Sequence, residues 1–206
     1  NLGLNDASVA GLAEQTQNPT FAFDSYRRFI QMFADVVKSV PRIHFEAILD
    51  TVKNENGYQF DNQLTLEDLT DLVAQYKAIY QRETGETFPQ EPLDQLHQAV
   101  QAVFSSWNNE RAILYREIHN ISHNLGTAVT IQSMVFGNRG NDSGTGVAFT
   151  RNPATGEKKL FGEFLMNAQG EDVVAGIRTP LDVDTLEEVM PAVYNEFKAI
   201  AEKLED

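Results

Sequence analysis

A glycine-dense segment, residues 126–180, constrains most strongly what this chain can fold into. Nine of the chain's thirteen glycines lie there, between short runs rich in β-branched and aromatic residues such as 127–135 and 146–149. Glycine permits backbone conformations and close approaches that a Cβ atom forbids, and runs of this composition favour strands. The segment therefore predicts tight β-hairpins whose backbone approaches another group closely.

The sequence on both sides of this segment is predicted to be helical. After Asp24 or Ser25, either of which can serve as an N-cap, apolar residues recur at helical spacing until Pro41 ends the run. The aromatic residues of this run share the period of its aliphatic residues, so we expect a core rather than a ligand cage. These aromatic residues are Tyr26, Phe29 and Phe33.

Further helices follow the same apolar spacing and local stop signals. Thr65 is the predicted N-cap of a long amphipathic helix that ends at Gly85, and Gly57 closes the helix before it. The predicted helical ranges are 7–14, 24–40, 43–53, 65–84, 96–107, 111–121 and 186–204. In the last range Asp184 or Thr185 is the cap, and Pro191 either kinks the helix or opens a second one.

Four strands are predicted within the glycine-dense segment. They cover residues 127–135, 145–150, 159–166 and 172–177, separated by polar, turn-forming residues. Five or six helices with short connections before residue 126 predict a helical bundle. The chain is therefore predicted to be α+β, with a helical bundle followed by a β-rich part.

Composition and charge exclude several functional classes. A chain of 206 residues with 42% hydrophobic residues can bury a substantial core. Its net charge of −14, with scattered Lys and Arg, argues against nucleic acid and against an anionic membrane surface as partners. The absence of cysteine excludes disulfides, cysteine-ligated zinc and a thiol nucleophile, and it fits a reducing cytosol.

The two ends of the sequence and its hydropathy carry further expectations. No apolar run approaches the roughly 18 residues that a membrane helix needs, and no signal peptide precedes the first predicted helix. A start at Asn1 and an end at Asp206, directly after a helical run, indicate a piece of a longer protein. We expect that protein in the cytoplasm, with an organelle form left open.

Few residues form a recognisable chemical motif by themselves. His119 and His123 are four residues apart, which is helical ligand spacing, but no set of carboxylates lies near them in sequence, so a helix end is favoured over a metal site. In the run 143–146, glycines expose backbone N–H groups and two hydroxyls add donors, which fits a phosphate cradle. A simple hairpin turn explains the same run equally well.

The amino-acid sequence of the glycine-dense segment resembles that of the nucleotide-binding domain of the pyruvate, phosphate dikinase family. The matching runs are GTAV (126–129), IQSMVFGN (131–138), SGTGV (143–147), FTRNP (149–153), TGEK (155–158) and NAQGEDVVAGIRTP (167–180). The resemblance continues upstream in NLGLND (1–6), DSYRRF (24–29) and AVFxSW (102–107, where x is any residue). It covers essentially the whole chain.

The resemblance implies part of an ATP-grasp domain, in which ATP lies between two α+β subdomains. Residues 1–10 and 97–142 would belong to the first subdomain, residues 11–96 to an inserted helical subdomain, and residues 143–206 to the second subdomain. The family converts ATP, phosphate and pyruvate into AMP, pyrophosphate and phosphoenolpyruvate through a phosphohistidine on a separate swivelling domain. Its enzymes are expected to be homodimers that use Mg²⁺.

The resemblance also implies roles for particular residues. The backbone of Gln132, Ser133 and Met134 would contact adenine, and Gly144, Thr145 and Gly146 would line the nucleotide cleft. Arg111, Glu163 and Arg178 are the expected docking contacts for the phosphohistidine domain.

The chain also departs from the family pattern. It lacks the Thr-Ser-His run of the phosphohistidine, the amino-terminal Lys and Arg that hold ATP phosphates, and the Asp-x-Glu and Gln-x-Arg pairs expected to hold Mg²⁺ and the terminal phosphates. Phosphoryl transfer depends on positioning and charge neutralisation. We therefore expect no catalytic and no metal-binding residues in this chain, weak or no ATP binding, and no dikinase activity of the chain alone.

Two other interpretations remain open at this point. One is a related dikinase that uses water or a glycan as second acceptor. The other is a non-catalytic interaction module with an acidic helical surface.

Overall fold

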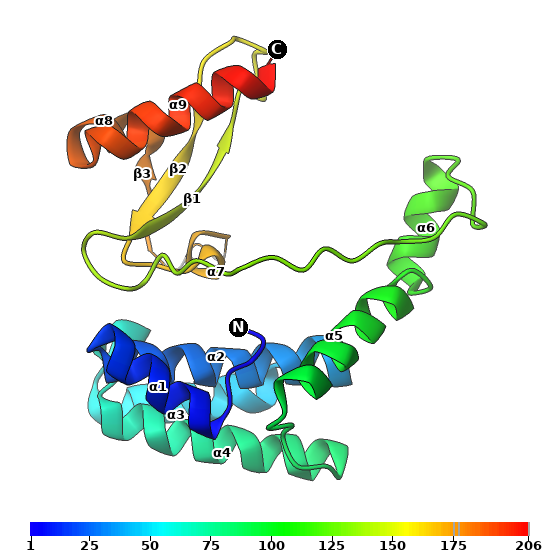
Figure 1. The fold of residues 1–206 in the computed structure, drawn as a ribbon, viewed down its shortest axis with the longest axis vertical. Helices are drawn as coiled ribbons and strands as arrows, with labels where there is room; N and C mark the ends of the chain where they lie inside the picture. The colour runs from blue at the N-terminus through cyan, green and yellow to red at the C-terminus, as the bar shows by residue number, and fades with distance from the viewer. Residues whose placement is uncertain (175, 177, 206) are drawn as a thin grey trace. The chain divides into compact units, whose positions relative to one another are not determined.

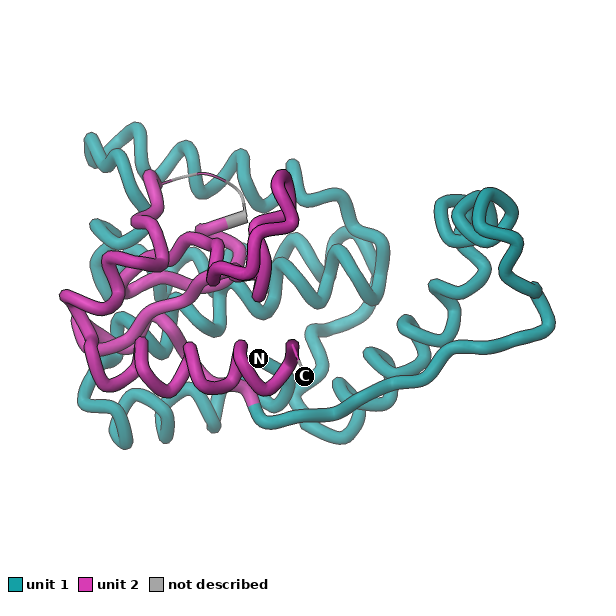
Figure 2. The backbone as a smooth tube through the Cα atoms, turned by 90° about the horizontal axis from the view of Figure 1, so that it is seen from above, with its two compact units in different colours: residues 1–133 teal, residues 134–206 magenta. Residues whose placement is uncertain are grey.

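The computed structural model describes residues 1–174, 176 and 178–205. The chain forms two compact units, Asn1–Ser133 and Met134–Asp206, which Figure 2 colours teal and magenta. Among the described residues, no helix combines the length and hydrophobicity needed to cross a membrane.

The first unit is helical. Helices α1 to α4 form a bundle, and α5 leads from it to α6 at the far end of this unit (Figure 1). The bounds are α1 Asp6–Thr16, α2 Pro19–Lys38, α3 Ile43–Asn56, η1 Asp61–Gln63, α4 Leu66–Thr84, α5 Pro92–Ser106 and α6 Glu110–Ile118. The predicted bundle is therefore confirmed.

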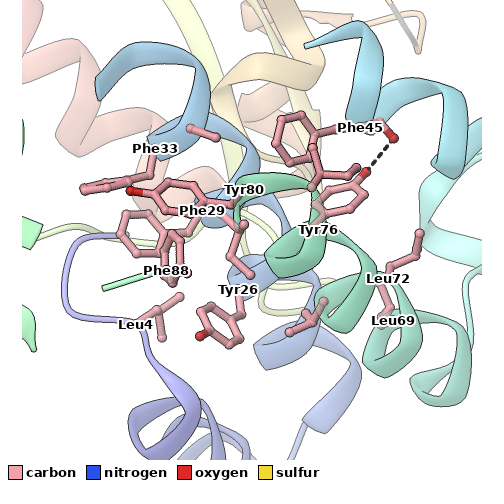
Figure 3. Close-up of a cluster of buried hydrophobic side chains, with 14 of the residues drawn as sticks. Leu4, Tyr26, Phe29, Phe33, Phe45, Leu69, Leu72, Tyr76, Tyr80 and Phe88 are labelled. Atoms are coloured by element: carbon pink, nitrogen blue, oxygen red, sulfur yellow. Dashed lines mark hydrogen bonds between the residues drawn. The ribbon is translucent and has the colours of Figure 1, made fainter. Parts of the chain in front are cut away.

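An aromatic cluster holds the bundle together. Phe88, from the loop after α4, packs edge-on against the rings of Tyr26, Phe29, Phe33 and Tyr80 at centroid distances of 5.3–6.1 Å. Figure 3 shows these rings side by side, together with the hydrogen bond that the Tyr76 hydroxyl donates to the Phe45 carbonyl. Burial raises the pKa of the Tyr80 hydroxyl to about 12. The expectation that Tyr26, Phe29 and Phe33 are core residues is confirmed.

The helix ends show which local signals are reliable. Thr65 caps α4 through Asp68 N–H, and Gly85 and Gly57 end α4 and α3 in the left-handed conformation, as predicted. The expected cap at Asp24 or Ser25 is wrong, because α2 begins earlier: Asn18 accepts from Phe21 N–H at 3.0 Å, with Pro19 in the first turn.

Asp24 instead belongs to a cluster of charges inside the bundle. The guanidinium of Arg27, with only 2% of its side chain exposed, donates to Asp24 at 2.5 Å and to Asp61 at 3.0 Å. Lys53 also donates to Asp61 at 3.0 Å, and Arg28 donates to Asp24 at 2.9 Å. Burial raises the pKa of Asp61, but Arg27, Lys53 and Arg28 outweigh burial, so the pKa is lowered overall.

A second polar cluster joins the two ends of the bundle. The fully buried amide of Gln95 accepts from Gly3 N–H at 2.8 Å and donates to the carbonyls of Leu4 and Pro89 at 2.9 and 2.8 Å. Beside it, Asn5 donates to the Gln90 carbonyl at 2.7 Å. The chain therefore enters and leaves the bundle at one place, which we call the amide staple (Asn5, Gln90 and Gln95).

The second unit is a three-stranded antiparallel sheet in the order β1-β2-β3, with helices α8 and α9 across one face (Figure 1). The bounds are β1 Gly144–Phe149, β2 Phe161–Met166, α7 Gly170–Val174, β3 Leu181–Asp182, η2 Val183–Thr185, α8 Leu186–Val189 and α9 Pro191–Glu205. Phe164 packs with Leu186 and Tyr194 on the helical side, while Leu165 packs with Ala168 and Val173. The α+β class is confirmed.

Three predictions for the glycine-dense segment and its surroundings need correction or completion. Residues 127–135, all within the described part of the chain, form no strand. A strand needs a partner strand from elsewhere in the chain, and the described strands β1 to β3 pair only with one another. The strand expected at 172–177 is wrong over 172–174, which lie in α7. The Asp172 carboxylate, in the first turn of this helix, accepts from the N–H of Gln169, the residue before the helix, as the third helical residue of a capping box does. Residues 175 and 177 lie outside the described residues. Pro191 opens a second helix.

We expect the change Asp61→Asn to lower the free energy of unfolding by about 2 kcal/mol at neutral pH, because it removes a hydrogen-bonded charge from buried Arg27. The lowered pKa means that Asp61 stabilises the fold above its unfolded-state pKa and loses this effect as pH falls through its folded-state pKa. The difference between the wild type and this variant should therefore shrink below about pH 4. Urea denaturation followed by circular dichroism measures both effects.

The exposed Asp50 on α3 provides the matched control, since Asp50→Asn changes the same net charge without touching Arg27. Equal losses in the two variants, or a gap between Asp61→Asn and the wild type that persists in acid, would contradict the role given to Asp61.

Candidate functional site

A cavity of ≈ 410 Å³ in the second unit contains most of the predicted cleft residues of that unit. Gly144, Thr145 and Gly146 of β1 line it, and Glu163 of β2 contributes to its wall. The remaining lining residues are Asp142, Val147, Ala148, Phe164, Met166, Val183, Leu186, Met190, Val193 and Phe197. The cavity is thus mostly apolar, with a few polar groups, which is the usual make-up of a small-molecule site.

The glycines of β1 are required by the close approach of β2. A Cβ atom on Gly146 would stand 2.6 Å from the Glu163 carbonyl oxygen and 2.9 Å from the Phe164 Cβ, and one on Gly144 would stand 2.9 Å from the Leu165 oxygen. Real Cβ atoms do not make such contacts with a neighbouring strand. The predicted close approach of glycine backbone is therefore confirmed, and the approaching group is protein.

The loop before β1 crosses the end of β2 at similarly short range. The Gly137 carbonyl accepts from Ala168 N–H at 2.9 Å, and the Ser143 carbonyl accepts from Asn167 N–H at 2.8 Å. A Cβ atom on Gly137 would collide with the Ala168 carbonyl. These contacts fix the loop 137–143 against the sheet and place residue 144 at the start of β1.

The predicted adenine-contacting residues lie at the division between the two units. Gln132 and Ser133 end the first unit, and Met134 begins the second. All three side chains are exposed, and they lie in an extended segment outside regular secondary structure. Backbone groups of such a segment are available for a ligand, because they are not used in a described strand.

The three expected docking residues have different surroundings. Arg111 is exposed in the first turn of α6, and Glu163 is exposed in the middle of β2. Arg178 instead donates to the carbonyls of Met166 and Asn167 at 2.9 and 3.1 Å, so its guanidinium fastens the end of β2.

A second cavity of ≈ 300 Å³ in the same unit was missed by sequence reasoning. Its charged lining residues are Lys158, Lys159, Lys198, Asp184, Glu202 and Glu205. Thr150 donates to Glu205 at 2.5 Å and Lys159 donates to Asp184 at 2.8 Å. The hydrogen bond from Thr150 is the main reason why the pKa of Glu205 is lowered. Because three lysines meet three carboxylates, this lining does not select an anion.

The histidine pair does not assemble a metal site in the described part of the chain. His119 is the C-cap of α6, which agrees with the expected place at a helix end, and its ring centroid lies 4.2 Å from that of Tyr115. His123 accepts a hydrogen bond from Arg116 at 3.0 Å. Among the described residues, no group of three or more His, Cys, Asp or Glu side chains is arranged to hold a metal ion.

A sequence model of the family described as "Pyruvate phosphate dikinase, AMP/ATP-binding domain" matches residues 23–199. The pyruvate, phosphate dikinase of Clostridium symbiosum is 59% identical over 206 residues, which are 100% of this chain and 24% of that protein. The chloroplastic pyruvate, phosphate dikinase of Mesembryanthemum crystallinum is 57% identical over 205 residues, covering 100% of this chain and 22% of that protein.

A third relative, pyruvate, phosphate dikinase 2 of Oryza sativa subsp. japonica, is 57% identical over 196 residues, covering 95% of this chain and 22% of that protein. The chain therefore spans less than a quarter of the length of these curated relatives.

We expect Gly146→Ala to destabilise the β1–β2 pairing by about 2 kcal/mol, because the added methyl group collides with the backbone of β2. Amide hydrogen exchange of β1 and β2 measures this loss locally. Gly140→Ala is the control in the same unit, because its Cβ atom would meet only the Asp142 carboxylate at 3.4 Å. Equal protection of both strands in the two variants would show that β2 does not require glycine at residue 146.

Proposed function

The chain belongs to the AMP/ATP-binding domain family of pyruvate phosphate dikinases, and on this basis we propose that it supplies part of the ATP site of a longer dikinase. The match over residues 23–199 carries this proposal. The structure also supports the proposal, because Gly144, Thr145 and Gly146 line a cavity.

In the proposed site, positioning is the main contribution of this chain. The backbone of Gln132, Ser133 and Met134 offers N–H and C=O groups to the edge of adenine, and the run from Gly144 to Gly146 forms one wall of the cavity in which a nucleotide would lie. Fixed backbone dipoles of this kind stabilise charge without reorganising during the reaction. The groups that would neutralise the phosphates belong to other parts of the longer protein.

The parent enzyme is proposed to remove two phosphoryl groups from ATP and release AMP. One of them ends on phosphate, which gives pyrophosphate, and the other passes through the phosphohistidine of a swivelling domain to pyruvate, which gives phosphoenolpyruvate. Mg²⁺ would neutralise charge on the phosphates in that reaction. The described residues offer no matching set of ligands, so we propose that residues elsewhere in the longer protein hold the ion.

Arg111 and Glu163 remain the proposed docking contacts for the phosphohistidine domain, because exposed charges suit a transient and steered interface. Arg178 is less suitable than its sequence context indicated, since its guanidinium holds the end of β2.

The parent protein is also proposed to be a homodimer in the cytoplasm. An organelle form is the alternative, because the relative from Mesembryanthemum crystallinum is chloroplastic.

Two alternative functions differ in the domains that the longer protein would need beside this chain. A related dikinase that uses water or a glycan would keep the ATP site but change the second acceptor. A non-catalytic module would need no histidine domain at all. Reading the coding sequence on both sides distinguishes them: a Thr-Ser-His run and a barrel domain downstream support the dikinase, and a reading frame without them favours the module.

We expect the isolated chain to bind Mg-ATP more weakly than about 1 mM, an affinity of about −4 kcal/mol, because the Lys, Arg and carboxylate groups that hold the phosphates are missing from it. Isothermal titration calorimetry measures this directly. Micromolar binding would contradict the view that those groups dominate affinity.

In the longer dikinase, we expect Arg111→Glu and Glu163→Arg each to slow the ATP-dependent phosphorylation of the histidine at least about tenfold, because each reverses a docking charge. Rapid-quench measurement of the phosphoenzyme follows this step. Arg82→Glu on α4 and Glu188→Arg on α8 are controls that change the same charges at other exposed positions. Equal rates in test and control variants would remove these residues from the docking surface.

A further inference from the structure

A buried arginine joins three segments at the far end of the helical unit. Arg116 of α6 has only 4% of its surface exposed. Its Nη1 donates to the Trp107 carbonyl at 2.5 Å, its Nε donates to His123 Nδ1 at 3.0 Å, and its guanidinium carbon lies 4.0 Å from the centre of the Trp107 ring. Because Trp107 is the C-cap of α5, this single side chain ties α5, α6 and the turn after α6 together.

Helix α6 buries little apolar surface among the described residues of its unit. The apolar side chains of this helix are largely exposed, with Leu114 at 56%, Tyr115 at 57% and Ile118 at 65%. Hydrophobic packing therefore contributes little to holding α6 in place in this chain. The contacts of Arg116 contribute correspondingly more to its position.

The bond to His123 requires a particular protonation state. Arg116 can only donate, so His123 Nδ1 must accept with a free lone pair, and the imidazole must be neutral. A proton on Nδ1 would remove the acceptor and place two positive charges in contact. Histidine is the side chain that ordinarily changes charge between about pH 5 and 8.

His123 is exposed, and the groups that contact it or its partner Arg116 come from α5, α6 and the turn. Arg116 is the charged group that faces it from α6, and Trp107 presents a ring and a carbonyl from the end of α5. In the turn itself, the neighbouring His119 packs its ring on Tyr115.

The turn held in this way leads directly into the proposed adenine-contacting segment. Only eight residues separate His123 from Gln132 in the sequence. An extended segment without strand pairing depends on its anchored ends for its position, and Arg116 provides the anchor at the amino-terminal end.

We propose that Arg116 is a positioning residue for the nucleotide-contacting segment, and that it acts through a hydrogen bond to neutral His123 which protonation breaks. The link to nucleotide rests on the proposed function, whereas the bond itself can be tested without ATP.

Trp107 reports on this arrangement directly, because it is the single tryptophan of the chain. On acidification from about pH 8 to about pH 5, we expect its fluorescence emission to shift to longer wavelength as the guanidinium leaves the ring. His123→Asn should abolish the shift, since the Asn carbonyl can replace Nδ1 as acceptor and does not titrate. His119→Asn is the matched control and should retain the shift.

Arg116→Lys separates this mechanism from direct quenching of Trp107 by a charged imidazole. Lysine keeps the charge but lacks the planar guanidinium that reaches both acceptors, so the variant should show the acid-type spectrum at every pH. The Ile121 N–H donates to the Arg116 carbonyl at 2.9 Å at the start of the turn, and its amide exchange should accelerate about tenfold at pH 8 when the turn is released. Circular dichroism confirms that the bundle is folded. A pH-dependent shift that survives in His123→Asn or in Arg116→Lys would overturn the proposed bond.

The role in nucleotide binding is tested in the longer dikinase. Arg116→Lys is expected to raise KM for ATP about tenfold with little change in kcat, because it disturbs binding geometry and touches no reacting group. If the fluorescence results hold but KM is unchanged, the bond stands and the positioning role is overturned. If ATP does not bind the longer protein at all, the proposed function fails while the fluorescence result is unaffected.

Discussion

Direct contact between backbones at glycine is the constraint on which the β-rich unit depends. Gly137, Gly144 and Gly146 each lie where a Cβ atom would overlap the main chain of a neighbouring segment. Because no side chain stands at these glycines, the loop 137–143 and strand β1 lie directly against β2, and the backbone of Gly144 and Gly146 forms one part of the cavity wall beside them. A wall of backbone is rigid, and its shape does not depend on rotamers.

The sequence predicted features with local causes, and it failed where distant partners decide. Thr65, Gly85 and Gly57 act on groups within a few residues, so their roles could be read correctly. The extended form of residues 127–135 could also be anticipated, but a strand needs a second strand, and alternation along one segment says nothing about whether a partner exists. The error at 172–174 is of another kind, because the local signals conflict: the valines favour a strand, whereas the Asp172 carboxylate stabilises a helix start by accepting from Gln169 N–H.

The glycines of the candidate site could be predicted from the sequence, but the residues that complete its cavity could not. Gly144 and Gly146 stand out by composition, whereas the cavity wall from α8 and α9, with Met190 and Phe197, follows from tertiary packing. The burial of charged residues and the groups that balance them were the hardest features to predict from the sequence. Arg27 and Arg116 are both buried, yet one is balanced by carboxylates and the other by a carbonyl, an aromatic ring and an imidazole. Asp24, three residues before Arg27 on the same helix, is a local signal for the first solution, whereas Asp61, Trp107 and His123 are partners brought together by the fold.

The amide staple has a mechanical consequence. Because Asn5, Gln90 and Gln95 bring the two ends of the α1–α4 bundle to one place, the bundle is attached as a side branch and not as a link in series. Conformational fluctuation or lengthening of the bundle therefore leaves the distance between its flanking segments unchanged. A branch of this kind can vary in length or in surface among relatives while the flanking chain stays in register with whatever surrounds it.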